Sequence, residues 1–304
     1  MNFLDLDNSF EESKFIIIPA EIGGTSVGSK GAEKAPESII KASWQIEDFD
    51  TELRFDLTQD KFHTTAPVRN LDDLYKLSLK TFKEGKIPII IGGEHFISHA
   101  VIKAMSDVYG KNISAVFFDA HADMFDEFSG NRMSHACALF LSLPFLKDFI
   151  SIGVRNIAKR ELEIIKNKRL EESFIFFEDA IIVDRKTGEV KINIKLIDKK
   201  IRNLKGEAIY ISFDFDFIDP GYLPSLSTPE PPGFSFIQTF FLLKMIINYF
   251  GNRIKGFDFV EFCPQGIFSS DVSAAKVISK SAAYLSYEIT RKTKNLKNKK
   301  IYAR

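Results

Sequence analysis

Short apolar segments rich in β-branched and aromatic residues recur along the 304-residue chain. Such segments are typical of strands buried on both faces of a parallel sheet, because a half-exposed strand would alternate apolar and polar residues. Each is too short to span a bilayer. We expect strands at residues 14–20, 87–93, 114–120, 149–155, 173–178, 208–217 and 255–264.

Segments with the apolar spacing of amphipathic helices lie between these strands. This alternation favours an α/β fold of three α/β/α layers around a mostly parallel central sheet. No repeat or long linker divides the chain, so we expect a single domain over residues 1–304, with its core at about 15–290 and a basic C-terminal tail at about 291–304. The expected helices lie at 71–84, 97–109, 159–169, 236–250 and 272–293.

The charge balance, 41 Lys+Arg against 41 Asp+Glu, provides no overall attraction to nucleic acid or anionic lipid. We therefore expect neither a nucleic-acid nor a membrane partner. Two cysteines, Cys137 and Cys263, are too few for a disulfide framework or a cysteine-based zinc site, and we expect both to pack in the interior. The acidic start of the chain is unlike a secretory signal, so we expect a cytoplasmic protein.

Acids and histidines follow four of the expected strands at the point where each strand ends. Ligands of parallel α/β sheets bind at the carboxyl ends of the strands, so these residues form the candidate site. A lone aspartate at such a position is usually a cap or turn residue, but the combination is not explained in that way. The residues are His95, Asp119, His121, Asp123, Asp214, Asp216 and Glu261.

Period-two geometry places some of these side chains together. In an extended chain, Asp119, His121 and Asp123 would share one face, and Asp214 would lie on the same face as Asp216. Carboxylates on one face repel each other and lose hydration unless a cation lies between them. The pattern therefore predicts a metal site.

The charge of the four aspartates indicates how many ions the site would hold. Two divalent cations would neutralise these four charges, with His95 and His121 as neutral nitrogen ligands. A ligand set of mostly carboxylates with two imidazoles favours Mn²⁺ over Zn²⁺ or Mg²⁺.

These motifs resemble those of the manganese ureohydrolases, the arginase and agmatinase family. The family motifs Gly-Gly-Asp-His-Ser, Asp-Ala-His-x-Asp and Ser-x-Asp-x-Asp-x-x-Asp-Pro are similar to residues 92–96, 119–123 and 212–220, in the same order. The resemblance covers about residues 15–290, and it implies an arginase-like fold and a homo-oligomer, either a trimer or a hexamer. Further similarity lies at residues 21–40, 153–155 and 231–235.

Three residues depart from the family pattern. Glu94 replaces an aspartate, Phe96 replaces a serine, and Phe234 follows Gly233 where the family has a second glycine. We expect the changes at 94 and 96 to alter the surroundings of His95 rather than the ligand itself. They bear on substrate preference and remove no expected ligand.

The resemblance implies two Mn²⁺ ions per subunit, each held by one histidine and three aspartates. Asp119 and Asp214 would bridge the two ions, and a hydroxide shared by the ions would attack the guanidinium carbon, releasing urea and a free amine. One ion would be held by His95, Asp119, Asp123 and Asp214, and the other by Asp119, His121, Asp214 and Asp216.

Three residues receive catalytic roles from the same resemblance. Glu261 would anchor and orient the guanidinium group, Asp123 would carry a proton to the leaving amine, and His135 would shuttle protons. We expect His99 to be a polar helix residue or a neighbour of the site, and His63 to lie on the surface.

The loop at residues 124–134 bears on the substrate. Its Asp126 and Glu127 resemble the agmatinase loop and would repel a carboxylate tail, which favours hydrolysis of agmatine to putrescine and urea, a step of polyamine biosynthesis. Asn131 and Arg132 could instead receive a carboxylate. Arginase, guanidinobutyrase and formiminoglutamase activities therefore remain alternatives.

Two other classes of protein fit the sequence less well than this enzyme. A metal-dependent deacetylase would typically need a His-His pair, which the sequence lacks. A metal-retaining binding or assembly protein would explain the departures at Glu94 and Phe96, but every expected ligand and Glu261 are present. No Gly-x-Gly-x-x-Gly motif follows a strand, which argues against a dinucleotide site.

Overall fold

An eight-stranded sheet, parallel throughout, forms the centre of this computed structural model. The structure describes residues 1–25, 28 and 30–301, with side chains up to residue 291. All seven expected strands are present. The eighth strand, β4 at the sheet edge, was not predicted, because its three residues are too few to show a pattern in the sequence. The spatial order is β4 (Phe62–Thr64), β1 (Phe15–Pro19), β5 (Ile87–Ile91), β12 (Ile254–Val260), β11 (Ala208–Asp214), β6 (Ile113–Phe118), β7 (Asp148–Val154) and β8 (Phe174–Phe176).

Alternate residues of the central strands pack on opposite faces of the sheet. Phe15 and Ile17 of β1 belong to one apolar cluster, whereas Ile16 and Ile18 belong to the other. Both faces are therefore covered, which is why these strands appear in the sequence as continuous apolar runs.

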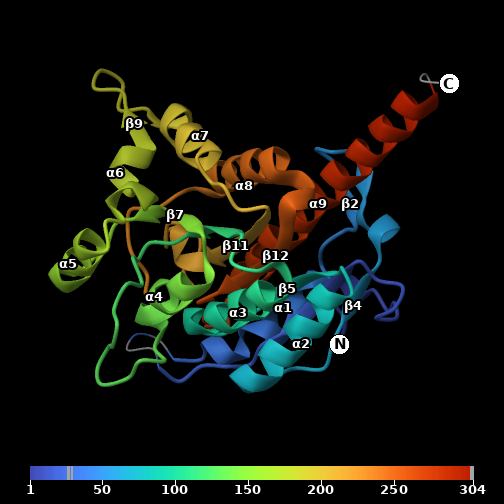
Figure 1. Ribbon diagram of the computed structural model, residues 1–304, viewed down its shortest axis with the longest axis horizontal. Coiled ribbons are helices and arrows are strands. Elements are labelled where there is room, and N and C mark those ends of the chain that lie inside the picture. The colour runs from blue at the N-terminus through green and yellow to red at the C-terminus, as the bar shows by residue number, and fades with distance from the viewer. Residues whose placement is uncertain (26–27, 29, 302–304) are drawn as a thin grey trace.

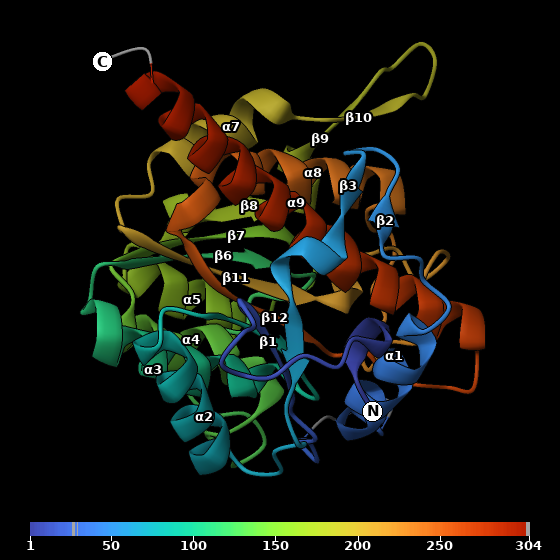
Figure 2. The ribbon, with the colours of Figure 1, turned by 90° about the vertical axis from the view of Figure 1, so that its right-hand side faces the viewer.

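Helices cover both faces and make the predicted three-layer α/β/α fold (Figure 2). One cover contains α1 (Ala35–Ser43), α6 (Phe177–Ala180), α7 (Ile194–Arg202), α8 (Phe236–Phe250) and α9 (Phe268–Ile301). The other contains α2 (Leu71–Lys83), α3 (Ser98–Tyr109), α4 (Ala138–Ser142) and α5 (Lys159–Asn167). The expected helices agree with α2, α3, α5, α8 and α9 apart from their ends.

Two small antiparallel pairs and several 3₁₀ turns complete the fold. The pairs are β2 (Phe49–Asp50) with β3 (Phe55–Asp56), and β9 (Ile181–Val183) with β10 (Val190–Ile192). The 3₁₀ turns are η1 (Phe3–Asp5), η2 (Ala32–Lys34), η3 (Leu57–Asp60), η4 (His95–Ile97), η5 (His135–Cys137), η6 (Leu143–Phe145), η7 (Glu171–Ser173), η8 (Phe215–Phe217) and η9 (Gly251–Arg253).

Helix starts are set by side chains that satisfy the free N–H groups of the first turn. Ser235 and Gln238 form a reciprocal capping box at the start of α8, and the Asn70 side chain accepts a hydrogen bond from the Asp73 N–H at the start of α2. α2 and α8 begin at residues 71 and 236, where the apolar spacing in the sequence predicted a helix to begin.

Helix α9 runs beyond the sheet, and its C-terminal end projects from the body of the molecule (Figure 1). The tail predicted at 291–304 falls within this helix up to Ile301, while residues 302–304 and the side chains after 291 lie outside the described residues. Residues 26, 27 and 29 of the predicted loop at 21–40 also lie outside them. Among the helices described, none is long and apolar enough to cross a membrane.

The order of the central strands brings the candidate residues together. Strands β5, β12, β11 and β6 are consecutive neighbours in the sheet, and each ends at the same edge because all are parallel. The four chain segments that follow them therefore converge on one place.

Candidate metal centre

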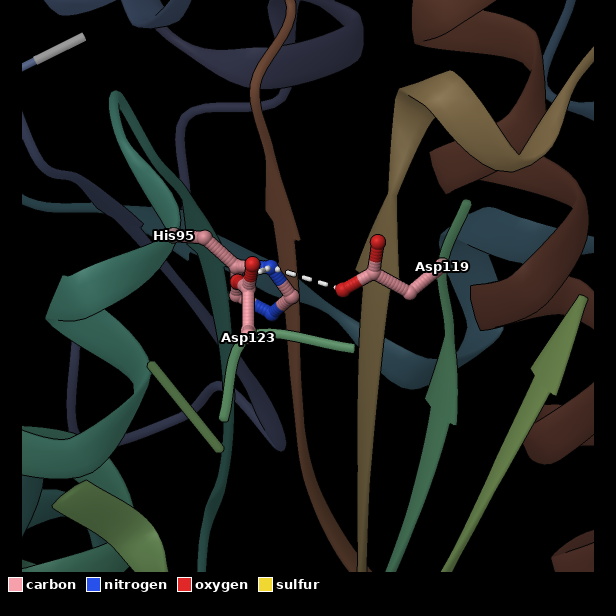
Figure 3. Close-up of side chains that lie close together, drawn as sticks. All are labelled: His95, Asp119 and Asp123. Carbon is pink, nitrogen blue, oxygen red and sulfur yellow. Dashed lines mark ion pairs between the residues drawn. The ribbon is translucent and has the colours of Figure 1, made fainter. Parts of the chain in front are cut away.

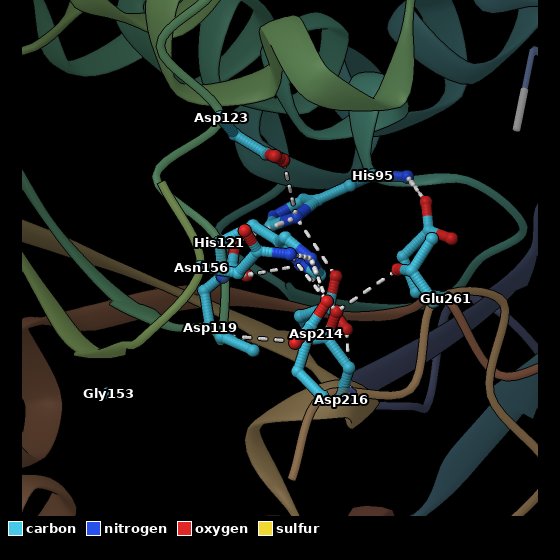
Figure 4. A network of polar contacts seen from close by, with 12 residues as sticks. His95, Asp119, His121, Asp123, Gly153, Asn156, Asp214, Asp216 and Glu261 are labelled. Atoms are coloured by element: carbon cyan, nitrogen blue, oxygen red, sulfur yellow. Dashed lines mark hydrogen bonds and ion pairs between the residues drawn. The ribbon is translucent and has the colours of Figure 1, made fainter. Parts of the chain in front are cut away.

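The imidazole of His95 faces three carboxylates (Figure 3 shows two of them, and Figure 4 all three). Its Nδ1 lies 3.2 Å from Oδ2 of Asp119, 3.1 Å from Oδ2 of Asp123 and 3.2 Å from Oδ2 of Asp214. All four residues are buried. Nδ1 makes no well-aligned hydrogen bond to any described residue, so it is a buried nitrogen surrounded by acceptors.

A second group is built around His121. Its Nδ1 lies 2.8 Å from Oδ2 of Asp216 and 3.9 Å from Oδ1 of Asp119. Potential ligand atoms of Asp119, His121 and Asp216 all lie within 4.8 Å of one another, as do those of His95, Asp119 and Asp123. Asp119 is thus common to two groups, each of which has the geometry to hold a metal ion.

The chain after β6 does not continue as the extended strand expected to residue 120. β6 ends at Phe118, the Asp119 carboxylate accepts a 2.6 Å hydrogen bond from the His121 N–H, and Asp123 has φ +49°. The prediction that Asp119, His121 and Asp123 share one face of a strand is therefore wrong. Their side chains converge because hydrogen bonds from side chain to backbone fold the loop around the site.

β11 is also shorter than predicted, because it ends at Asp214 rather than at residue 217. Asp216 lies in the 3₁₀ turn η8, and its N–H donates a 2.8 Å hydrogen bond to Oδ1 of Asp214. The carboxylate of Asp216 also accepts a 3.0 Å hydrogen bond from the Ala120 N–H, which joins the two loops. The turn, rather than strand alternation, brings the two aspartates together.

Burial and mutual repulsion perturb the protonation of this cluster. Burial and the neighbouring carboxylate of Asp119 raise the pKa of Asp123 to about 7. Burial alone would lower the pKa of His121, but the charge of Asp216 and other carboxylates raise it to about 10. Burial alone would raise the pKa of Asp216, but the charge of His121 outweighs this effect and lowers the pKa to about 2.

This donor set fits divalent cations. Buried carboxylates that repel one another hold protons when no cation is present, and a bound cation removes that cost. The unbonded Nδ1 of His95, amid three carboxylate oxygens, is the structural observation that fits a metal ligand most directly.

A chain of buried hydrogen bonds holds the Nε2 side of the His95 ring, opposite the nitrogen that faces the carboxylates. Nε2 of His95 lies 2.9 Å from Oγ of Ser212, which donates a 2.7 Å hydrogen bond to Oδ1 of Asp258. Tyr210 donates a 2.7 Å hydrogen bond to the other oxygen of Asp258. Because the Ser212 hydroxyl donates its proton to Asp258, its oxygen accepts a hydrogen bond from the N–H at Nε2 of His95. The neutral imidazole therefore carries its proton on Nε2, and the lone pair of Nδ1 is directed at the carboxylates.

Sequence reasoning did not identify Asp258. A charged residue inside the apolar run at 255–264 was the signal that could have revealed it, since a fully buried acid needs specific partners.

Glu261 lies beside His95 in a left-handed backbone conformation, with φ +62° (Figure 4). Its N–H donates a 2.8 Å hydrogen bond to the carbonyl of Gly93, and its Oε1 accepts a 2.6 Å hydrogen bond from the His95 N–H. The other oxygen, Oε2, is buried and has no hydrogen-bond partner among the described residues. Burial raises the pKa of Glu261 to about 8.

His135 is positioned at a cavity of about 290 Å³ next to the cluster. Its N–H donates a 3.1 Å hydrogen bond to Oγ1 of Thr25, and its ring meets the edge of Phe128. Burial lowers the pKa of His135. The cavity is lined by His121, Asp123, Phe125, Phe128, His135, Ala136, Asn156, Ala158, Glu161, Thr228 and Glu230.

Glu94 has a different role from the one expected. Its carboxylate accepts hydrogen bonds from the N–H groups of Gly24, at 2.7 Å, and Thr25, at 2.8 Å. The change from aspartate therefore bears on the loop at 23–25, and through Thr25 on His135, more than on the ring of His95. Of the other departures, Phe96 is buried, and Phe234 stacks on Phe217 with a centroid distance of 4.3 Å.

The loop residues used to infer the substrate do not line this cavity. Asp126 is exposed and pairs with Arg160 at 2.6 Å, and Glu127 lies 3.6 Å from Arg132. Asn131 accepts a hydrogen bond from the Met133 N–H. From these positions, Asp126, Glu127, Asn131 and Arg132 do not contact a substrate in the cavity, so they do not discriminate between agmatine and arginine there.

Two histidines and both cysteines lie outside the cluster. His99 is half-buried in α3, with Nδ1 2.5 Å from the carbonyl of Phe96. His63 is half-buried in β4 rather than on the surface, and its Nδ1 lies 2.8 Å from the carbonyl of Asn8. Cys137 and Cys263 are free and buried, as expected.

Comparison with known proteins identifies the family. The model of the arginase family matches residues 13–284. The chain belongs to the arginase family. The predicted assignment to the ureohydrolases, with greatest similarity to agmatinases, is thereby confirmed, as is the arginase-like fold.

Individual relatives of this arginase-family chain span most of its length. The N(1)-aminopropylagmatine ureohydrolase of Thermus thermophilus is 28% identical over 284 residues, covering 91% of this chain and 92% of the relative. The solved agmatine ureohydrolase of Thermoplasma volcanium superposes with a TM-score of 0.81 at 28% identity, covering 95% of this chain and 96% of the other. Arginase 2 of Arabidopsis thaliana is 33% identical over 206 residues, covering 66% of this chain and 55% of the relative.

Proposed function

We propose that this protein catalyses the Mn²⁺-dependent hydrolysis of agmatine to putrescine and urea. The observation that carries the proposal is the convergence of two imidazoles and four carboxylates at the carboxyl edge of an arginase-family sheet. N(1)-aminopropylagmatine is a second candidate substrate, because relatives that cover most of the chain bear that name.

The two histidines anchor the two proposed metal sites. His95 with three aspartates would hold one ion, and His121 with three aspartates the other, with Asp119 and Asp214 shared. Two bound divalent cations would supply a water nucleophile at neutral pH and neutralise the aspartates. The proposed ligands are His95, Asp119, Asp123 and Asp214 for one ion, and Asp119, His121, Asp214 and Asp216 for the other.

Glu261 is the proposed anchor of the guanidinium group. One carboxylate oxygen is held by the His95 N–H, and the other is buried without a described partner. A guanidinium N–H would satisfy that oxygen and form a charge-assisted hydrogen bond, which orients the planar carbon. This explains why a carboxylate is kept in so buried a position.

Proton transfer is assigned to Asp123 and His135. Both line the cavity of about 290 Å³, where the leaving amine would emerge. Asp123 would pass a proton to that amine, and the half-buried imidazole of His135 would exchange protons with solvent.

The lining of the cavity favours a cationic substrate. Among the described residues that line it there is no lysine or arginine, whereas Asp123, Glu161 and Glu230 are acids. An arginine substrate would require donors for its α-carboxylate. The absence of a basic residue from the described lining therefore favours agmatine over arginine, and also over guanidinobutyrate and formiminoglutamate.

The decisive assay measures urea release by the Mn²⁺-loaded protein from agmatine, N(1)-aminopropylagmatine, arginine, guanidinobutyrate and formiminoglutamate. We expect the highest kcat/KM with agmatine and loss of turnover after chelation. A folded, metal-loaded protein that hydrolyses none of these compounds would refute the enzyme proposal and support a binding or assembly protein.

Localisation, oligomeric state and the extent of the domain can also be proposed. We propose a cytoplasmic homo-oligomer, a trimer or hexamer, whose subunit is one domain with its core at about residues 15–290. Light scattering coupled to size-exclusion chromatography tests the oligomeric state, and limited proteolysis tests the extent of the core.

A further inference from the structure

We propose that Glu230 determines specificity by binding the terminal ammonium group of the substrate. This inference rests on the proposed function, because it concerns the far end of the same guanidine substrate. Glu230 was not among the residues predicted from the sequence.

Glu230 shares the cavity with the cluster. Its Oε1 lies 3.7 Å from Nε2 of His121, and it accepts a hydrogen bond from the side-chain amide of Asn156. Its side chain is 30% exposed. The carboxylate thus lies between the proposed metal site and solvent, where the tail of a substrate would pass.

The backbone of Glu230 is tied rigidly to the site. Arg155 donates hydrogen bonds from Nε, at 2.9 Å, and Nη2, at 2.7 Å, to the carbonyl of Glu230. Nη2 of the same arginine donates at 2.6 Å to the carbonyl of Asp216. This link sets the separation between Glu230 and the proposed metal ligands, and a fixed separation can select for substrate length.

The other carboxylates of the cavity are already engaged. Both oxygens of Glu161 accept backbone hydrogen bonds, from Met124 at 3.0 Å and from Ala158 at 2.9 Å. Asp123 faces His95. Glu230 Oε2, by contrast, takes part in no hydrogen bond or ion pair with the described residues, so it is available for a ligand.

The cavity wall also suits the alkyl part of such a substrate. The rings of Phe125 and Phe128 lie 5.2 Å apart at their centroids and both line the cavity. An aliphatic chain can pack on these rings while the guanidinium group and the ammonium group each meet a carboxylate. Agmatine has this arrangement of charges, with a cation at each end of a four-carbon chain.

The test compares agmatine with n-butylguanidine, which has the same guanidinium group and four-carbon chain but no ammonium group. We expect Glu230→Gln to lower the ratio of kcat/KM for agmatine to that for n-butylguanidine by about 10- to 100-fold, the range expected for a lost hydrogen bond to a charged group. Glu127→Gln is the matched control, because Glu127 is an exposed acid of the neighbouring loop outside the cavity, and it should leave the ratio unchanged.

If Glu230 acted only by positioning His121, its replacement would lower kcat/KM equally for agmatine and n-butylguanidine. Equal losses for agmatine and n-butylguanidine in the Glu230→Gln variant, with a reduced metal content, would overturn the inference while leaving the proposed function intact. A melting temperature close to that of the unsubstituted protein verifies that the variant is folded.

Calorimetric binding to the Mn²⁺-loaded protein separates the inference from the proposed function. Agmatine binding that weakens in the Glu230→Gln variant, without urea release by the unsubstituted protein, would refute hydrolysis and support the inference. If neither compound binds and neither is hydrolysed, both proposals fail.

Discussion

The backbone N–H of His95 donates a 2.6 Å hydrogen bond to Oε1 of Glu261, joining residues 166 positions apart in the sequence. A proposed metal ligand and the proposed guanidinium anchor are therefore held by one contact. Because Oε1 is engaged in this way, Oε2 is left as the buried acceptor without a described partner. The same bond thus positions the anchor and leaves one of its oxygens free for substrate.

Replacing Glu261 by glutamine should lower kcat/KM for agmatine by about 100-fold, because a neutral amide cannot make a charge-assisted hydrogen bond to the guanidinium group. The metal content should stay near that of the unsubstituted protein, since Glu261 is not a proposed ligand. Urea release and elemental analysis measure the two quantities. Unchanged catalysis would exclude the anchoring role.

Replacing Asp216 by alanine should reduce the metal content and lower turnover by at least about 100-fold. The carboxylate lies 2.8 Å from Nδ1 of His121 and also accepts the Ala120 N–H, so its loss removes a proposed ligand and loosens the loop. Elemental analysis and urea release check this. The control is Asp126→Ala, which removes an exposed acid that pairs with Arg160. A full metal complement in the Asp216 variant would contradict the proposed ligand set.

Metal affinity should fall as pH is lowered from 8 to 6. In the metal-free protein, burial raises the pKa of Asp123 to about 7, and the carboxylates, Asp216 foremost, raise that of His121 to about 10 despite its burial. Both groups must lose their protons to bind a cation, so protons compete with metal and binding releases them. Titration calorimetry in buffers of different ionisation enthalpy measures the protons released. Affinity and proton release that do not vary with pH would refute this coupling.

Replacing Asp258 by asparagine should weaken metal binding by about 10- to 100-fold, although the residue contacts no proposed metal site. The substitution alters the acceptor of the Ser212 hydroxyl, and with it the orientation of His95. Tyr210→Phe is the matched control, because it removes the other hydrogen bond of Asp258 and leaves the Ser212 contact in place. Competition with a chelator measures the affinities. An equal effect of both substitutions would indicate a general packing defect.

Replacing Gly153 by alanine should destabilise the protein by about 2–4 kcal/mol. Gly153 has φ +104°, and an added Cβ would lie 2.7 Å from Cε2 of Phe217 and 3.0 Å from the carbonyl of Asp119. Gly188→Ala is the control for backbone strain, since Gly188 has φ +73° and no atom within 4 Å of the added carbon, and should cost about 1–2 kcal/mol. Urea unfolding followed by circular dichroism measures both. Equal costs would show that the contacts at Gly153 do not matter.

Most of the fold could be predicted from local pattern. The runs that became β1, β5, β6 and β11 are apolar because both sides of each strand are buried, and that requirement is visible in any short window of sequence. Strand ends were less well predicted. Ala120, Phe215 and Phe217 continue the apolar runs in the sequence, but hydrogen bonds to Asp119 and Asp214 turn the backbone there.

The chemical groups of the candidate site could be recognised from local sequence. Residue type and spacing place two histidines and four aspartates after β-rich segments, and the parallel sheet that those segments imply has one carboxyl edge where such residues meet. Strand direction and charge are enough to bring these residues together, without knowledge of distant contacts.

The contacts that support the site became visible in the three-dimensional structure. It showed that Ser212 and Asp258 orient His95, that Glu94 holds the loop at 23–25, and that Glu230 rather than Asp126 or Glu127 lines the cavity. Burial and hydrogen-bond partners depend on which distant segments of the chain meet, and a short stretch of sequence does not contain that information. A glutamate in the sequence looks the same whether its carboxylate is paired at the surface or buried beside the proposed metal site.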